Sequence, residues 1–129
     1  MVNRSYSTAV VANVNVVNAV ETVAQNSPAV SLTYDGDSVN VSGTVDITTG
    51  ATTTAVVIRC RRGNGITGTV VGTSETDTLG AAVSAPISFD FLDNPGAVAG
   101  QVYSITVQQT GGSSNGTVNS CVSAWTLGT

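Results

Sequence analysis

The sequence contains neither histidine nor lysine, and four arginines are its only basic residues. Without histidine no Ser-His-Asp or Cys-His arrangement can form, and without lysine there is no Schiff base and no Ser-Lys pair. The formal acid–base pairs that remain are Asp90 with Asp93 and Glu75 with Asp77. Both pairs fall at turns or loops, where a carboxylate is ordinarily solvated, whereas glycosidic chemistry needs two carboxylates held across a bond. We therefore expect a protein that is not an enzyme and has no catalytic residue.

Charge and long apolar runs are also scarce. Only 9% of residues are charged and the net charge is −4, against about 25% charged residues in an average soluble domain. An acidic chain lacks the clustered positive charge that nucleic acids require, and no apolar stretch has the length of a membrane span or a secretory signal. We expect neither a nucleic-acid nor a membrane partner. So little charge suits a subunit that packs against neighbours, and it also suits an extracellular protein with a neutral polar surface.

The residues that are abundant favour strands. Val and Thr, which are β-branched and suit a pleated surface, dominate together with Ala, Ser, Asn and Gly. Apolar and polar residues alternate with period two between turns rich in Gly, Asn, Asp and Pro, which is typical of half-buried strands. The sequence predicts a single all-β domain over residues 1–129, an antiparallel β-sandwich of about eight strands. The predicted strands after residue 28 are 29–34, 39–48, 52–62, 66–73, 81–92, 101–110 and 117–127.

The first 28 residues are predicted to form an extended arm outside the sandwich core, because Asn26, Ser27 and Pro28 break the chain before the regular alternation begins. Asparagines are interspersed among valines there, and an amide buried without partners costs a few kcal/mol. Residues 15–25 alone could also form a short helix. If the arm lies on another subunit, its candidate interface residues are Val10, Val14, Val16, Asn13 and Asn15.

Three arginines lie close together in the predicted strand 52–62. Alternation places Arg59 and Arg61 on one face and Arg62 on the other. We expect them to pair with carboxylates of the same or a neighbouring subunit, and we add Arg59 and Arg61 to the interface candidates. The alternative is that they are solvated charges that protect an edge strand from further pairing.

The two cysteines, Cys60 and Cys121, are too few for a disulfide framework and have no metal or redox spacing. Cys60 shares a strand face with Val56 and Ile58. We expect both cysteines to point inward as small apolar fillers, although a single bridge between two strands stays open.

Two short motifs resemble ligand sites but do not complete them. Asp35-Gly36-Asp37 resembles the start of a calcium loop, yet no later Glu completes the coordination shell. Residues 63–68 fit the spacing G-x-G-x-x-G but lie between two strands, not before a helix. Turn formation explains both, so we expect no cofactor and no metal.

Several segments carry a resemblance to known proteins: STAVVANVNVVNAVETVA, TTTAVVIRCRRG, GQVYSITVQQTGG and NGTVNSCVSAWTLGT. In this order they resemble the strands of small jelly-roll sandwiches of the tumour-necrosis-factor-like type. Short Thr-, Val- and Gly-rich chains of this style also resemble structural proteins of tailed bacteriophages, which serve as capsid decoration (cement) or minor tail proteins, commonly as trimers. The resemblance implies a virion protein, assembled in the host cytoplasm, that forms homotrimers on the major capsid protein.

The alternative is an extracellular role as the receptor- or carbohydrate-binding head of a tail fibre or minor tail protein. Such a module needs exposed aromatic residues that stack on sugar rings. The candidates are Trp125, Tyr6, Tyr34 and Tyr103. All but Tyr6 lie in strand phase, for which we expect burial in the core or in an interface.

Overall fold

The computed structural model describes residues 4–7 and 11–127, and the side chains of 11–127. These residues form strands, turns and loops and include no helix, so there is none that could cross a membrane. The eleven strands are β1 (Arg4–Ser7), β2 (Val11–Val16), β3 (Thr22–Asn26), β4 (Val30–Leu32), β5 (Ser38–Thr48), β6 (Ala55–Arg62), β7 (Val70–Glu75), β8 (Ser84–Asp93), β9 (Val98–Gln101), β10 (Tyr103–Thr110) and β11 (Gly116–Leu127).

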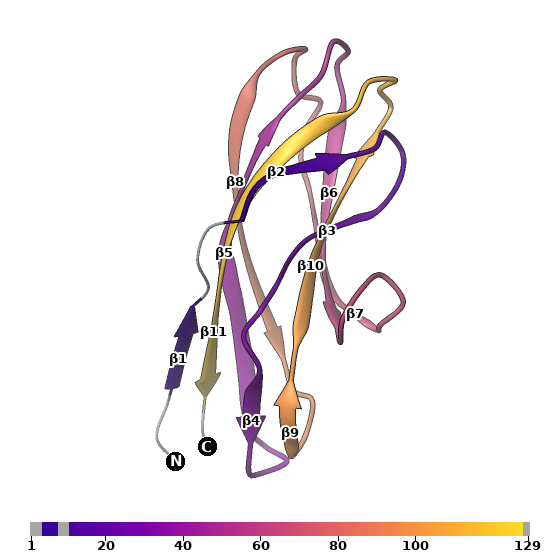
Figure 1. The fold of residues 1–129 in the computed structure, drawn as a ribbon. Coiled ribbons are helices and arrows are strands. Elements are labelled where there is room, and N and C mark those ends of the chain that lie inside the picture. The colour runs from indigo at the N-terminus through magenta and orange to yellow at the C-terminus, as the bar shows by residue number, and fades with distance from the viewer. Residues whose placement is uncertain (1–3, 8–10, 128–129) are drawn as a thin grey trace.

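The strands form two facing antiparallel sheets (Figure 1). One has the order β1-β11-β5-β8, and β2 pairs with β11 beyond the end of β1. The other has the order β3-β10-β6-β7, and a small sheet pairs β4 with β9. The β3–β4 segment is interrupted at residues 27–29, where Pro28 has no N–H to donate to a ladder.

Three pairs of short strands, β1 with β2, β3 with β4 and β9 with β10, follow one another along the chain and pair with the same partner segments. Treating each pair as one reduces the eleven strands to eight segments. Their order is then first-eighth-third-sixth in one sheet and second-seventh-fourth-fifth in the other. This double Greek key is the jelly-roll sandwich, so the predicted fold class and the strand count of about eight are confirmed.

The core lies between the sheets and is built from the inward faces of the predicted strands. On β5, for example, Val41, Val45 and Ile47 are fully buried, whereas Asp46 and Thr48 are exposed. One side of the sandwich is closed by close contact between β7 and β8. A Cβ atom on Gly72 would lie 2.5 Å from Cδ1 of Phe91, so the ring packs over bare backbone. The fully buried side chains are mostly Val and Ile: Val16, Val30, Val39, Val41, Val45, Ile47, Val56, Ile58, Ile105, Val107 and Val122.

The expectation of an N-terminal arm outside the sandwich is corrected for residues 11–26. Strand β2 pairs with β11 and strand β3 pairs with β10, so both belong to the sheets. Val16 is fully buried and Ala24 is 4% exposed, and both belong to the core cluster. The helical alternative for residues 15–25 is also wrong, since a turn joins two strands there.

The amides of this segment avoid burial by facing outward. Asn13 and Asn15 are exposed, whereas Val16 points into the core and Val14 packs against it. Asn13 has a φ of 58°, in the left-handed region that Asn tolerates better than most residues. The ladder between β2 and β11 shifts register beside it. Val10 lies outside the described residues.

The cysteines lie in different environments. Cys60 is fully buried between the sheets, as predicted, whereas Cys121 is partly exposed, and no disulfide joins the two cysteines. The prediction that Cys121 points inward is wrong, because it shares the outer face of β11 with Asn119 and Trp125 while Val122 points into the core.

Candidate interaction surface

The outer face of the β11–β5–β8 sheet is a regular grid of side chains. Neighbouring strands are antiparallel and pair without a register shift from Ser38 to Thr48, so residues of the three strands lie directly opposite one another. Opposed side chains in such a sheet are close enough to act together. The rows run Trp125–Asn40–Leu92, Ser123–Ser42–Asp90, Cys121–Thr44–Ser88 and Asn119–Asp46–Pro86. We call this grid the outer face.

One end of the outer face is apolar and exposed. Trp125 is 45% exposed and Leu92 is 63% exposed, in the same row. Asn40 lies between them, and its Nδ2 donates a hydrogen bond to Oδ1 of Asp90 in the next row. An exposed tryptophan has a large rigid surface and a polar N–H, and tryptophan is enriched among the residues that contribute most to binding interfaces.

Two of the aromatic residues lie outside the core of the single chain. Trp125 and Tyr34 are not in the core, and Tyr34 is 60% exposed. Tyr103 is fully buried, as predicted. The side chain of Tyr6 lies outside the described residues. Strand phase correctly grouped Trp125 with the polar residues of β11, and that grouping was the signal that it faces outward.

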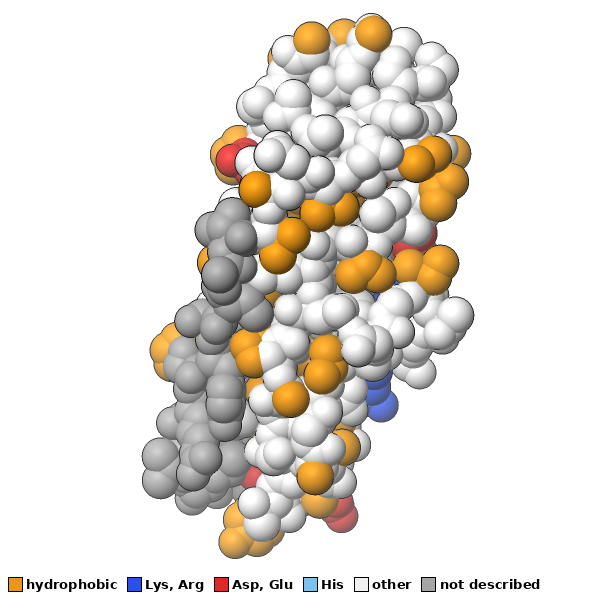
Figure 2. Space-filling model, in the orientation of Figure 1, with side chains coloured by type: hydrophobic (Ala, Val, Ile, Leu, Met, Phe, Trp, Pro, Cys, Tyr) orange, Lys and Arg blue, Asp and Glu red, His pale blue; other side chains and the backbone are white. Residues whose placement is uncertain are grey.

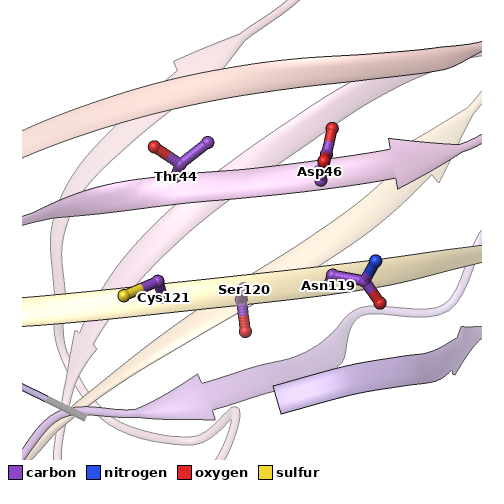
Figure 3. A pocket seen from close by; sticks show the side chains of 5 residues that line it. All are labelled: Thr44, Asp46, Asn119, Ser120 and Cys121. Carbon is purple, nitrogen blue, oxygen red and sulfur yellow. The ribbon is translucent and has the colours of Figure 1, made fainter. Parts of the chain in front are cut away.

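A shallow hollow of about 140 Å³ lies toward the other end of the outer face (Figure 3). It is located where the ladder between β2 and β11 is irregular. The side-chain Oδ1 of Asn119 accepts a hydrogen bond of 2.8 Å from the backbone N–H of Asn13, which fixes β2 beside it. The lining residues are Thr44, Asp46, Asn119, Ser120 and Cys121. The hollow therefore offers hydroxyl, carboxylate, amide and thiol groups in a space the size of one side chain.

The outer face is acidic. Asp46 and Asp90 are exposed on it, and none of its described side chains is basic. The arginines whose side chains are described, Arg59, Arg61 and Arg62, all come from β6, in the opposite sheet. The side of the molecule seen in Figure 2 shows few charged side chains, red or blue, among white and orange atoms.

Arg59 and Arg61, the predicted interface arginines, are engaged within the chain. Arg61 donates two hydrogen bonds to the carboxylate of Glu21, at 2.7 and 2.9 Å, and Thr106 donates another at 2.6 Å. The bonds from Arg61, joined by that from Thr106, lower the pKa of Glu21 despite its partial burial. Arg59 donates to Oε1 of Gln108 at 2.8 Å. The edge-strand alternative is wrong, because β6 lies between β10 and β7.

Arg62 points between the sheets, as alternation predicted, and forms a three-residue cluster there. Its guanidinium donates to both carboxylate oxygens of Asp93, at 2.8 and 2.7 Å, and the Tyr103 hydroxyl donates to Oδ2 of Asp93 at 2.8 Å. Burial alone would raise the pKa of Asp93, but the bonds from Arg62 and Tyr103 outweigh it and the pKa is lowered. We call these residues the Arg62–Asp93–Tyr103 cluster.

Sequence reasoning missed the partners of this cluster and of Arg61. A signal for the cluster was present: an inward-pointing arginine next to Cys60 needs a carboxylate, because an unpaired buried charge is strongly destabilising. Nothing local indicated which carboxylate. Asp93 follows Arg62 by 31 residues and Glu21 precedes Arg61 by 40.

The acid–base pair Asp90 with Asp93 is not brought together. Asp90 is exposed on the outer face of β8, whereas Asp93 is 8% exposed and points between the sheets. Within residues 11–127, no three His, Cys, Asp or Glu side chains lie where they could hold a metal ion.

The two thiols are expected to differ in reactivity. Burial, with a smaller contribution from nearby Asp93, raises the pKa of Cys60 to about 12, and a thiol rather than a thiolate is a poor nucleophile. Iodoacetamide should therefore modify Cys121 at least about tenfold faster than Cys60 in the native protein. Intact mass and peptide mapping measure this. A folded Cys121→Ser variant should stay unmodified until denaturant is added, and equal labelling of both cysteines would contradict the assignment.

Comparison with known proteins gave matches in structure only. No protein-family model and no curated protein matches the chain. A structure of the Gx strain of infectious bursal disease virus superposes with a TM-score of 0.63 and 15% identity, over 98% of this chain and 33% of that chain. A T13 particle of the same virus superposes with a TM-score of 0.62 and 12% identity, over 95% of this chain and 31% of that chain. The VP2 subviral particle of this virus superposes with a TM-score of 0.62 and 12% identity, over 97% of this chain and 32% of that chain.

The chain thus spans about a third of the length of the viral proteins it matches. At 12 to 15% identity the likeness concerns the fold. It extends over nearly all of this chain, so the whole jelly roll, and not an isolated hairpin, has a counterpart in proteins of an icosahedral virus particle.

Proposed function

We propose that this chain is a structural protein of a virus particle. The observation that carries the proposal is the complete double Greek key, which superposes over 98% of the chain on part of a virus-particle protein. The low charge content of 9% supports it, because a subunit packed against neighbours does not need a strongly charged surface.

More specifically, the chain is proposed to be a decoration (cement) subunit that binds the major capsid protein of a tailed bacteriophage as a homotrimer. Residues 11–26 are part of the sheets, so attachment uses a face of the sandwich instead of a free arm. The outer face offers an exposed tryptophan and leucine among polar groups, and such patches are typical of interaction sites.

A non-enzymatic role belongs to the same proposal. The sequence has no histidine and no lysine, and the structure separates Asp90 from Asp93. Glu21 and Asp93, the two carboxylates with lowered pKa, are both held by arginines and are therefore poor proton donors at neutral pH.

One observation favours a second candidate, a glycan-binding head module. Trp125 is exposed on a strand face with Asn40 and Ser123 beside it. A sugar ring can stack on the indole while amide and hydroxyl groups bond its own hydroxyls.

The proposal is tested on particles purified from the native source. We expect peptide mass spectrometry to find this chain in density-banded particles in fixed ratio to the shell protein. Light scattering of the purified chain should give three times its 12.9 kDa mass. Absence from the particles, with the chain abundant in the lysate, would refute a structural role. A monomer at micromolar concentration that is also unpaired on the particle would refute the trimer.

A further inference from the structure

We propose that the outer face binds a basic, extended segment of a partner protein. The inference rests on the proposed structural function, for which it names the chemistry of the partner. Three features of the face carry it: its charge, its exposed indole and the distance between the Trp125 row and Asp46.

Charge complementarity indicates that the bound segment of the partner is positively charged. Asp46 and Asp90 are exposed on the outer face, with no basic side chain among those described there. The arginines whose side chains are described are held on or behind the other sheet, Arg59 by Gln108, Arg61 by Glu21 and Arg62 by Asp93. A face with one sign of charge attracts the opposite sign and rejects its own.

The exposed indole of Trp125 favours a partner side chain that carries its positive charge at the end of a long methylene stem, as Arg and Lys do. Trp125 is 45% exposed, and a guanidinium or ammonium that lies over an indole is attracted by the ring electrons. Leu92, in the same row and 63% exposed, can pack against the methylene stem of such a side chain. Asn40 holds the Asp90 carboxylate beside this row through its hydrogen bond. The Trp125 row and Asp90 of the neighbouring row thus provide aromatic, aliphatic and acidic contacts for one basic side chain.

The distance between the Trp125 row and Asp46 favours an extended segment. Asn40 and Asp46 are six residues apart on β5, which is about 20 Å at roughly 3.3 Å per residue. Two side chains six residues apart on an extended partner point to the same side, because the period is two. One would lie over the Trp125 row while the other enters the hollow of about 140 Å³ beside Asp46. A helix of the same number of residues would span less than half that distance.

The test uses a synthetic nine-residue peptide with Arg at positions 2 and 8 and Thr elsewhere, and a matched peptide with uncharged citrulline at both positions. Trp125 is the single tryptophan of the chain, so its fluorescence reports binding at this face. We expect a saturable change with the arginine peptide, weakened by added salt. By anisotropy of the labelled peptide, Asp46→Asn, Asp90→Asn and Trp125→Leu should each weaken binding about threefold to tenfold. Asp77→Asn, the same change in the loop after β7, should leave it unaltered.

Several results would overturn the inference. These are equal binding of the citrulline peptide, unchanged affinity in the outer-face variants, or no binding at millimolar peptide. A saturable fluorescence change with a neutral glucose hexamer and none with the arginine peptide would assign the face to glycans. These outcomes are independent of whether the chain is found in particles, so failure of the inference is distinguishable from failure of the structural role.

Discussion

A chain that lacks residues 1–25 is expected to lose its fold. The deletion removes β1, β2 and nearly all of β3, and with them the edge partners of β11 and β10. It also removes Glu21, which leaves Arg61 without its carboxylate. Total domain stability is about 5–15 kcal/mol, and the loss of three strands and an ion pair should exceed it. Far-ultraviolet circular dichroism and sedimentation should show an unfolded or aggregated chain.

A single substitution tests the same point quantitatively. Val16 is fully buried, whereas its neighbour Val17 is 44% exposed. Val16→Ala should lower the free energy of unfolding by about 2–3 kcal/mol, from lost burial plus the cavity left behind. The matched Val17→Ala variant should change it by less than about 0.5 kcal/mol. A cooperatively folded deletion variant, or equal effects of the two alanines, would restore the idea of a detachable arm.

The second large effect is expected at the Arg62–Asp93–Tyr103 cluster. Asp93→Ala leaves the buried Tyr103 hydroxyl without its acceptor and Arg62 without its partner. Removing one partner of a fully buried pair costs about 3–5 kcal/mol. The Arg62 side chain is 38% exposed and can be partly solvated, so we expect a loss of about 2–3 kcal/mol. Urea unfolding measures it.

The cluster also predicts the direction of the pH dependence. The folded pKa of Asp93 is lowered, and so is that of Glu21. A carboxyl with a depressed folded pKa binds fewer protons when folded, so it stabilises above its unfolded pKa of about 4 and loses that contribution as pH falls through the folded value. Stability should be level near neutrality and fall below about pH 4.

Two variants separate the contributions within the cluster. Asp93→Asn should flatten the acid decline, because the titrating carboxyl is gone. Tyr103→Phe keeps the ring and removes one hydrogen bond, and should cost about 1–2 kcal/mol while keeping most of the pH dependence. If Asp93→Asn matches the parent in stability at both pH 7 and pH 3, the ion pair contributes nothing to the fold.

The sequence alone determined the fold class and most of the strands. On β5 and β11 the alternation is regular, and the residues of one phase are buried while those of the other are more exposed. Because period-two patterning reports which side chains share a face, it also placed Arg62 opposite Arg59 and Arg61 correctly. The absence of histidine and lysine excluded His-based triads, Schiff bases and Ser-Lys pairs from the sequence alone.

Only the tertiary structure showed which face of each strand is buried and which distant residues it contacts. Alternation grouped Cys121 with Trp125, but only the packing of Val122 against the opposite sheet shows that their face is the outer one. The first 28 residues appeared unsuited to a core because Asn and Val are mixed, yet pairing with β11 turns Asn13 and Asn15 outward and Val16 inward. Glu21 and Asp93 were found as arginine partners only once distant strands lay side by side. Side-chain direction is a local property of the backbone, whereas the choice of partner depends on contacts between residues far apart in the chain, which no local pattern encodes.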